Sequence, residues 1–245
     1  MSNKYKKLGK LYAVGVGPGD PELLTFKAIK ILKTVSNIFS VTSSSESKST
    51  AFDIISDYIS NRCICKQLYF PMTKDQSLLK EAWDKNAHEV YDVLKRGEDA
   101  AFITLGDPSI YSTYSYLWEY LSLIDRHIDV EVIPGITSFQ AASARLNIPL
   151  VKGDESLTIL TGVNGNKRLE EIFPVSDNIV IMKIYRHWKE IFRFLTSQNN
   201  IEVASVISRC GLDGEKVWRD IRDLNLNETP SYFTLAVVKK ASDEN

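Results

Sequence analysis

The feature that most constrains this chain is a glycine-rich turn that joins an apolar segment to a polar one near the start. The run 11–25 begins with residues typical of a buried strand and ends with residues typical of a helix start. The turn between them contains Gly15, Gly17 and Gly19. Glycine permits positive φ and close approach by other groups, while Asp20 and Pro21 suit the cap and first position of a helix. A strand, a tight turn and a helix predict the opening unit of an α/β sheet, whose ligands usually bind beyond the carboxyl ends of the strands.

The same order of strand, turn and helix recurs twice along the first half of the chain. An apolar strand is expected over 100–104, followed by Gly-Asp-Pro at 106–108 and then by helical sequence. A third apolar run is broken by Pro-Gly at 134–135, after which Thr137 or Ser138 can cap a helix. We expect strands that end in such turns to open onto one crevice.

Alternation of strands and helices in the first half predicts a mostly parallel sheet. The strands are expected over 10–17, 35–41, 63–70, 100–104 and 130–133, and the helices over 22–33, 51–60, 74–96 and the residues after 107. Pro149 and Gly153 interrupt this pattern. We therefore predict an N-terminal α/β domain over 1–150.

The second half, 151–245, is predicted to form a second α/β domain. Strands are expected over 156–162, 178–183, 203–208, 215–219 and 232–238, with helices over 167–173 and 187–195. Because several of these strands follow one another without a helix, we expect a mixed sheet.

The first turn does not fit the common nucleotide-binding motifs. It lacks the Gly-Lys-Ser/Thr of phosphate loops, and its glycines are spaced Gly-x-Gly-x-Gly instead of Gly-x-Gly-x-x-Gly. No acidic residue ends the second strand at 41–43, where a carboxylate would hold the ribose of NAD. The sequence therefore disfavours both an NTPase and a dinucleotide enzyme.

In order and spacing, the segments 14–25, 105–108 and 134–138 resemble the three motifs of the tetrapyrrole methylase family, which uses S-adenosylmethionine. The resemblance extends from about residue 10 to about residue 240. Three further stretches, 69–75, 110–117 and 152–155, are similar to members that methylate carbon 20 of precorrin-2 or cobalt-factor II in cobalamin biosynthesis. The resemblance therefore implies a carbon methyltransferase with a tetrapyrrole substrate.

The resemblance also implies a homodimer and a cofactor cleft between the two domains. The residues implied to contact S-adenosylmethionine are Pro18, Leu105, Gly106, Asp107, Ile110, Thr137, Ser138 and Met182, with Ala204 and Leu235 on strands expected to complete the adenine slot. The cofactor has no phosphate, and backbone groups at glycine turns can approach its charged and polar groups closely.

Methyl transfer to a tetrapyrrole needs little chemistry from the protein. The substrate brings an electron-rich carbon, and alignment with the sulfonium methyl can contribute about 7–11 kcal/mol. A base would remove the proton, or the product would lose it later. The sequence does not identify that base; the candidates are Asp107, Tyr111, Tyr114 and Tyr185. The three histidines, His88, His127 and His187, are interpreted as surface or structural residues.

The substrate carries many carboxylates, which arginine and lysine can bind. The candidate cations are Arg145, Arg186, Arg209, Lys74 and Lys152. The net charge of −1 gives no indication of nucleic-acid or membrane binding. No apolar run approaches the roughly 20 residues of a membrane span, and no signal-peptide core follows the basic start, so we expect a cytoplasmic protein.

Two local features carry weaker expectations. Cys63 and Cys65 have no second pair or nearby histidine, so no metal site is expected. The polar run 42–49 is interpreted as an exposed loop or as a mobile flap at the crevice. Two other functions stay open: a family member that methylates another ring carbon or an rRNA or protein target, and a regulatory protein that binds S-adenosylmethionine without catalysis.

Overall fold

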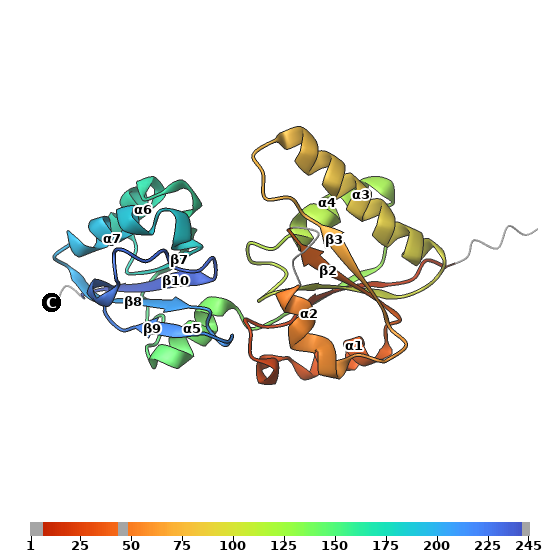
Figure 1. Ribbon diagram of the computed structural model, residues 1–245, viewed down its shortest axis with the longest axis horizontal. Coiled ribbons are helices and arrows are strands. Elements are labelled where there is room, and N and C mark those ends of the chain that lie inside the picture. Colours follow the sequence, from red (N-terminus) through yellow and green to blue (C-terminus); the bar gives the residue numbers. More distant parts are fainter. Residues whose placement is uncertain (1–6, 44–48, 242–245) are drawn as a thin grey trace, which may run out of the picture. The chain divides into compact units, whose positions relative to one another are not determined.

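The computed structural model describes residues 7–43 and 49–241 of the chain. The chain forms two compact units, Met1–Thr137 and Ser138–Asn245 (Figure 1). These units part before the helix at 138–146, whereas the division predicted from the sequence falls after it and stays a prediction. Residues 44–48, the centre of the run expected to be a loop or flap, lie outside the described residues.

The first unit contains a five-stranded sheet in the order β3-β2-β4-β1-β5. Its strands are β1 (Leu11–Gly15), β2 (Asn37–Thr42), β3 (Ile64–Tyr69), β4 (Ala100–Thr104) and β5 (Val130–Ile133). Every pairing between them is parallel, so the predicted parallel sheet is confirmed. Because all five run the same way, the loops that follow them leave one edge of the sheet.

Helices cover both faces of this sheet. They are α1 (Phe26–Thr34), α2 (Thr50–Ile55), α3 (Gln76–Lys95) and α4 (Tyr114–Ile124). Figure 1 shows α3 and α4 on one face, with α1 and α2 on the other. Alternate residues of β4 serve the two layers: Phe102 belongs to the core with Leu117, whereas Ile103 belongs to the core with Leu32. This double burial explains why the central strands read as nearly continuous apolar runs.

The second unit contains a sheet in the order β6-β7-β10-β8-β9. Its strands are β6 (Leu157–Thr161), β7 (Asn178–Met182), β8 (Ile201–Ser208), β9 (Lys216–Trp218) and β10 (Thr234–Lys240). β6 and β7 pair in parallel, and the other pairings are antiparallel. The predicted mixed sheet is confirmed.

The helices of the second unit are α5 (Ser138–Leu146), α6 (Lys167–Ile172) and α7 (Trp188–Thr196). On α7, Trp188, Ile191 and Leu195 are spaced three and four residues apart and are buried in the core of this unit. Among residues 7–43 and 49–241, no helix combines the length and the hydropathy that crossing a membrane requires.

Two helices begin later than the sequence predicts. Asp20 caps, through the Glu22 N–H, a 3₁₀ turn at Pro21–Leu23, and α1 starts beyond it under a separate cap, Thr25. The expected helix after Asp107 starts only at Tyr114, because the Asp107 side chain holds the intervening residues in a loop. Local cap signals were thus correct, but they mark short turns as well as helices.

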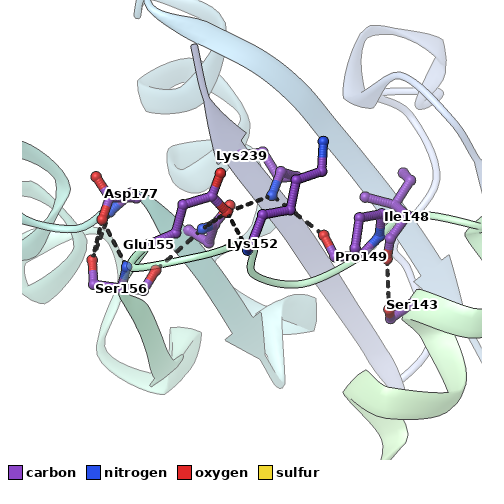
Figure 2. A network of polar contacts seen from close by, with 9 residues as sticks. Ser143, Ile148, Pro149, Lys152, Glu155, Ser156, Asp177 and Lys239 are labelled. Carbon is purple, nitrogen blue, oxygen red and sulfur yellow. Dashed lines mark hydrogen bonds and ion pairs between the residues drawn. The ribbon is translucent and has the colours of Figure 1, made fainter. Parts of the chain in front are cut away.

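A buried lysine fixes the segment that joins α5 to β6 onto the second sheet (Figure 2). Lys239 of β10 is 5% exposed, and its Nζ lies 3.1 Å from Glu155 Oε2 and 3.3 Å from the Pro149 carbonyl. The same Glu155 oxygen accepts hydrogen bonds from the Lys152 N–H and from Asn178 Nδ2. One carboxylate therefore ties the joining segment to both β7 and β10.

Candidate functional site

The three predicted turns meet at the carboxyl edge of the first sheet. β1 lies between β4 and β5, so the turns after these strands leave the sheet side by side. Two backbone hydrogen bonds join the first two turns: the Gly17 N–H donates to the Gly106 carbonyl over 3.4 Å, and the Gly106 N–H donates to the Gly17 carbonyl over 2.8 Å. These turns leave the same edge of the sheet, and the crevice onto which we expect them to open stays a prediction.

Glycines at this edge serve two different needs. A Cβ on Gly135 would lie 2.2 Å from the Gly106 carbonyl oxygen, and one on Gly15 would lie 2.7 Å from the Gly135 nitrogen, so neither position admits a side chain. Gly106 has φ 67°, and the one described heavy atom within 4 Å of a Cβ there would be Thr137 Cα at 3.9 Å. A methyl group at Gly106 would therefore make only an ordinary van der Waals contact, so the surroundings of this backbone are less crowded than those of Gly15 and Gly135.

Asp107 joins the second turn to the third. Its Oδ1 accepts from the N–H and hydroxyl of Ser109, and its Oδ2 accepts from the Gly135 N–H over 3.0 Å. Burial alone would raise the pKa of Asp107, but these hydrogen bonds outweigh it and hold the pKa below its ordinary value. The group is therefore a fixed, buried negative charge at neutral pH.

Two hydroxyl groups hold the end of the second loop, between β4 and α4, against the end of β4. Thr104 Oγ1 and Ser112 Oγ are 3.0 Å apart, and Ser112 Oγ accepts from the Tyr114 N–H over 3.1 Å. Between them Tyr111 takes φ 47° and is 50% exposed. Left-handed conformations are uncommon for residues other than glycine and are enriched at functional sites. Tyr111 is thus presented outward from a constrained loop.

The predicted cofactor residues that follow β1, β4 and β5 gather at this one edge. They are Pro18, Leu105, Gly106, Asp107, Ile110 and Thr137, and Ser138 follows as the first residue of α5. Pro18 and Thr137 are buried, whereas Leu105 and Ile110 are half-buried. The group combines backbone carbonyl and N–H groups, apolar side chains and one carboxylate, which suits a cationic, polar and partly aromatic ligand.

The predicted cofactor residues of the second unit are only partly brought together. Met182 ends β7 and is paired with Leu235 of β10. Ala204 is paired with Val238, further along β10, and it is Ile207 that pairs with Leu235. The sequence placed Ala204 on the correct strand, but it could not show the register between β8 and β10.

The four candidate bases have different environments. Tyr114 lies in the core against Phe102, and burial raises its pKa to about 12, which favours the protonated phenol. Asp107 has a lowered pKa and is engaged in hydrogen bonds, so it is a weak base. Tyr111 and Tyr185 keep part of their surface accessible. Of the four, these two are better suited to meet a substrate.

The candidate cations differ in their partners and in their exposure. Arg145 is paired with Glu215, its Nε lying 2.6 Å from Oε1. Arg209 Nε donates to the Asp213 carbonyl, and the Arg186 guanidinium lies over the ring of Tyr185. Lys74 and Lys152 are exposed, as are His88 and His127, while His187 is half-buried beside Glu190.

Sequence reasoning missed the residues that hold the loops in place. Ser109 is signalled by the spacing Asp-x-Ser, in which an aspartate accepts from the backbone two residues on. Lys183, which follows Met182 with φ 56°, has no such signal, because a left-handed lysine cannot be read from a sequence.

Comparison with known proteins places the chain among enzymes of tetrapyrrole metabolism. A protein of Methanocaldococcus jannaschii, described as a probable cobalt-precorrin-2 C(20)-methyltransferase, is 40% identical over 236 residues, which cover 96% of this chain and 98% of the relative. The cobalt-precorrin-2 C(20)-methyltransferase of Salmonella typhimurium is 29% identical, over 95% of this chain and 97% of the relative.

Solved structures support the same fold. A cobalt precorrin-4 methyltransferase is 21% identical, with a TM-score of 0.71 and coverage of 94% of each chain. A uroporphyrin-III C-methyltransferase of Thermus thermophilus, complexed with S-adenosylhomocysteine, has a TM-score of 0.63 at 20% identity, covering 94% of this chain and 97% of that one. Residues 10–224 match the family described as Tetrapyrrole (Corrin/Porphyrin) Methylases. The chain therefore belongs to the tetrapyrrole methylases.

Proposed function

We propose that this protein transfers the methyl group of S-adenosylmethionine to carbon 20 of precorrin-2, or of its cobalt form, in cobalamin biosynthesis. The observation that carries the proposal is the 40% identity, over nearly the full length of both chains, with a relative described by that reaction. The fold alone does not indicate which ring carbon is methylated, because the descriptions of the structural neighbours name other tetrapyrrole substrates.

The interlocked turns of the first unit fit the proposed cofactor. The uncrowded surroundings of the Gly106 backbone suit the close approach of a ligand, and Asp107 supplies a buried negative charge that attracts a cation. We infer that Pro18, Leu105, Ile110, Thr137 and Ser138 complete this part of the site. For Met182, Leu235 and Ala204 of the second unit, contact with the cofactor stays a prediction.

The proposed role of the chain in the reaction is mainly to position and enclose the reactants. When bound, S-adenosylmethionine supplies an electrophilic methyl group for attack by the ring carbon. Fixed turns hold one reactant before the other arrives, and such alignment can contribute about 7–11 kcal/mol. Asp107 is too acidic to accept the substrate proton readily. Tyr111 and Tyr185 keep accessible surface, so these two are the better candidates to contact the substrate.

The test is incubation of the protein with precorrin-2 and methyl-labelled S-adenosylmethionine under anaerobic conditions. We expect one label per ring, located at carbon 20 by NMR, and a parallel assay with cobalt-factor II gives the preferred ring form. A label on another ring carbon, or on rRNA or protein, would assign a different family activity. Binding of cofactor and ring without turnover, beside an active control enzyme, would favour a regulatory role.

The cellular setting is proposed on the same basis. We infer a cytoplasmic homodimer that binds neither nucleic acid nor membrane, in keeping with the family resemblance and the net charge of −1. Light scattering after gel filtration checks the dimer, since a mass near the 27.7 kDa of one chain would contradict it.

A further inference from the structure

Aromatic and cationic side chains gather at one end of the second sheet. Pairing of Met182 with Leu235 and of Ser208 with Thr234 places the end of β7, the start of β10 and the end of β8 side by side. Lys183 directly follows β7, Arg209 directly follows β8, and Phe233 directly precedes β10. All of these residues belong to the second unit.

Three aromatic rings form a connected ladder at this end. The ring centroids of Tyr185 and Tyr232 are 5.2 Å apart with planes at 65°, and those of Tyr232 and Phe233 are 5.2 Å apart at 79°. The Arg186 guanidinium lies 5.3 Å from the Tyr185 ring centroid. Tyr232 is 39% exposed, so the ladder is not sealed within the core. Such a surface can contact a flat, conjugated ligand.

Two cations flank the start of β10 in the left-handed conformation. Lys183 and Arg209 both have φ 56°. The Arg209 N–H donates to the Phe233 carbonyl over 2.8 Å, and its Nε donates to the Asp213 carbonyl over 2.6 Å, which orients the guanidinium while using one of its five donors. Burial lowers the pKa of Lys183. Glycine or asparagine would adopt this backbone conformation with less strain, so the left-handed φ does not by itself select a cation at either position.

We propose that Lys183, Tyr185, Arg186, Arg209, Tyr232 and Phe233 form a surface that binds the carboxylated rim of the tetrapyrrole substrate. The inference rests on the proposed function and assigns the substrate a specific contact surface. The rings contact the flat macrocycle, and the cations pair with its carboxylate side chains. The cofactor carries a single carboxylate, whereas the tetrapyrrole carries several, so a group of cations fits the tetrapyrrole better.

The test uses substitutions that keep the backbone and remove the charge. Asparagine accepts left-handed φ, so Lys183→Asn and Arg209→Asn should fold, which circular dichroism checks. Arg209→Lys keeps the charge but loses the planar fork. Arg168→Gln removes a cation from the exposed face of α6 and serves as the matched control. Uroporphyrin III, a stable carboxylated macrocycle, is the binding probe, and S-adenosylhomocysteine reports on the cofactor site.

We expect each asparagine variant to weaken uroporphyrin III binding, and to raise KM for precorrin-2, by about tenfold or more. Arg209→Lys should show a smaller loss. Binding of S-adenosylhomocysteine should stay within about twofold of the wild-type value, and Arg168→Gln should change neither ligand. Tetrapyrrole binding that is unaffected in both asparagine variants, or a loss confined to S-adenosylhomocysteine, would overturn the inference.

Failure of the proposed reaction gives a different result. If the wild-type protein methylates another carbon while the variants still lose macrocycle affinity, the reaction is reassigned and the surface stands. If the wild-type protein methylates carbon 20 and the variants match it in KM, the surface alone is rejected. If the wild-type protein binds no tetrapyrrole, both proposals fail.

Discussion

Gly135 and Gly106 lie in one group of interlocked turns, yet a methyl group would have different consequences at each. At Gly135 it would collide with the backbone of both neighbouring turns, and a backbone carbonyl cannot move aside as a side chain does. At Gly106 it would make an ordinary van der Waals contact with Thr137 Cα, 3.9 Å away, and would collide with nothing described. The first glycine therefore serves folding, and the second serves access to the backbone.

The two substitutions should separate stability from binding. Gly135→Ala is expected to lower the free energy of unfolding by about 1–3 kcal/mol, the usual cost of overpacking, measured by urea denaturation. Gly106→Ala should cost about 1 kcal/mol for its left-handed backbone, but should abolish most S-adenosylhomocysteine binding in calorimetry. Gly153→Asn, at φ 56° with nothing nearby, is the control. Equal effects of the two alanine variants on both measurements would contradict this division.

Asp107 should contribute a pH-dependent part of the stability. In Asp107→Asn an amide N–H can face the Gly135 N–H, so we expect a loss of about 1–3 kcal/mol near pH 7 by urea denaturation. The folded pKa lies below the ordinary value of 3.8, so this stabilisation is complete above 3.8 and is lost as the pH falls through the folded pKa. The difference between the two proteins should therefore shrink below about pH 4, and a constant difference would exclude this origin.

At the scale of residues, the sequence located the turns but not their partners. The Gly-Asp-Pro motif predicts a loop at 106–108, and Asp107 does lie in it. Its bond to Gly135 depends on β1, β4 and β5 lying adjacent, which one sequence does not state. A similar limit applies to Ala204. The sequence predicts its strand but not its partner on β10, because the register of an antiparallel pair depends on how the two strands align, and in the structure Ala204 does not pair with Leu235.

Among the elements, the segment joining α5 to β6 depends on an asymmetric ion pair. Lys239 is almost wholly buried, whereas the Glu155 side chain is 28% exposed and keeps two other donors. Glu155→Gln removes the negative charge that compensates a buried ammonium group, while Lys239→Met leaves a carboxylate that water can reach. We therefore expect Glu155→Gln to lower the urea midpoint more than Lys239→Met does. The reverse order would contradict this account.

The long helix α3 depends on Asp75, the cap residue that precedes it. Asp75 Oδ1 accepts from the N–H groups of Ser77 and Leu78, which have no partner within the helix. We expect Asp75→Ala to lower the free energy of unfolding by about 1 kcal/mol in urea denaturation. Asp84→Ala, on the exposed face of the same helix, is the control and should change it by less than about half that amount.

Apolar runs predicted strands such as β1, β4 and β7, because strands buried on two faces carry continuous apolar sequence. Helix starts were less accurate. The sequence predicts α4 directly after Asp107, but the loop to Ser112 is held by bonds to Gly135 and Thr104. Contacts between segments outweighed local preference there.

For the whole molecule, cofactor binding should appear as added stability. A ligand that binds only the folded chain, present at about a hundredfold its Kd, stabilises it by about 2.7 kcal/mol. We expect this increase with S-adenosylhomocysteine in urea denaturation, and little increase in Gly106→Ala. Adenosine and homocysteine added separately are the control. An equal increase in the wild-type protein and in Gly106→Ala would place the ligand elsewhere.

The reciprocal bridge between Gly17 and Gly106 has a consequence for how such proteins diversify. Because the turns are hydrogen-bonded to one another, a substitution in one turn requires compensating substitutions in the others. Tolerated substitutions in these turns should therefore occur together. The outer part of the second loop, around Tyr111, lies outside that bridge. Directed evolution toward new ring positions should therefore randomise this outer part first and leave the bonded glycines untouched.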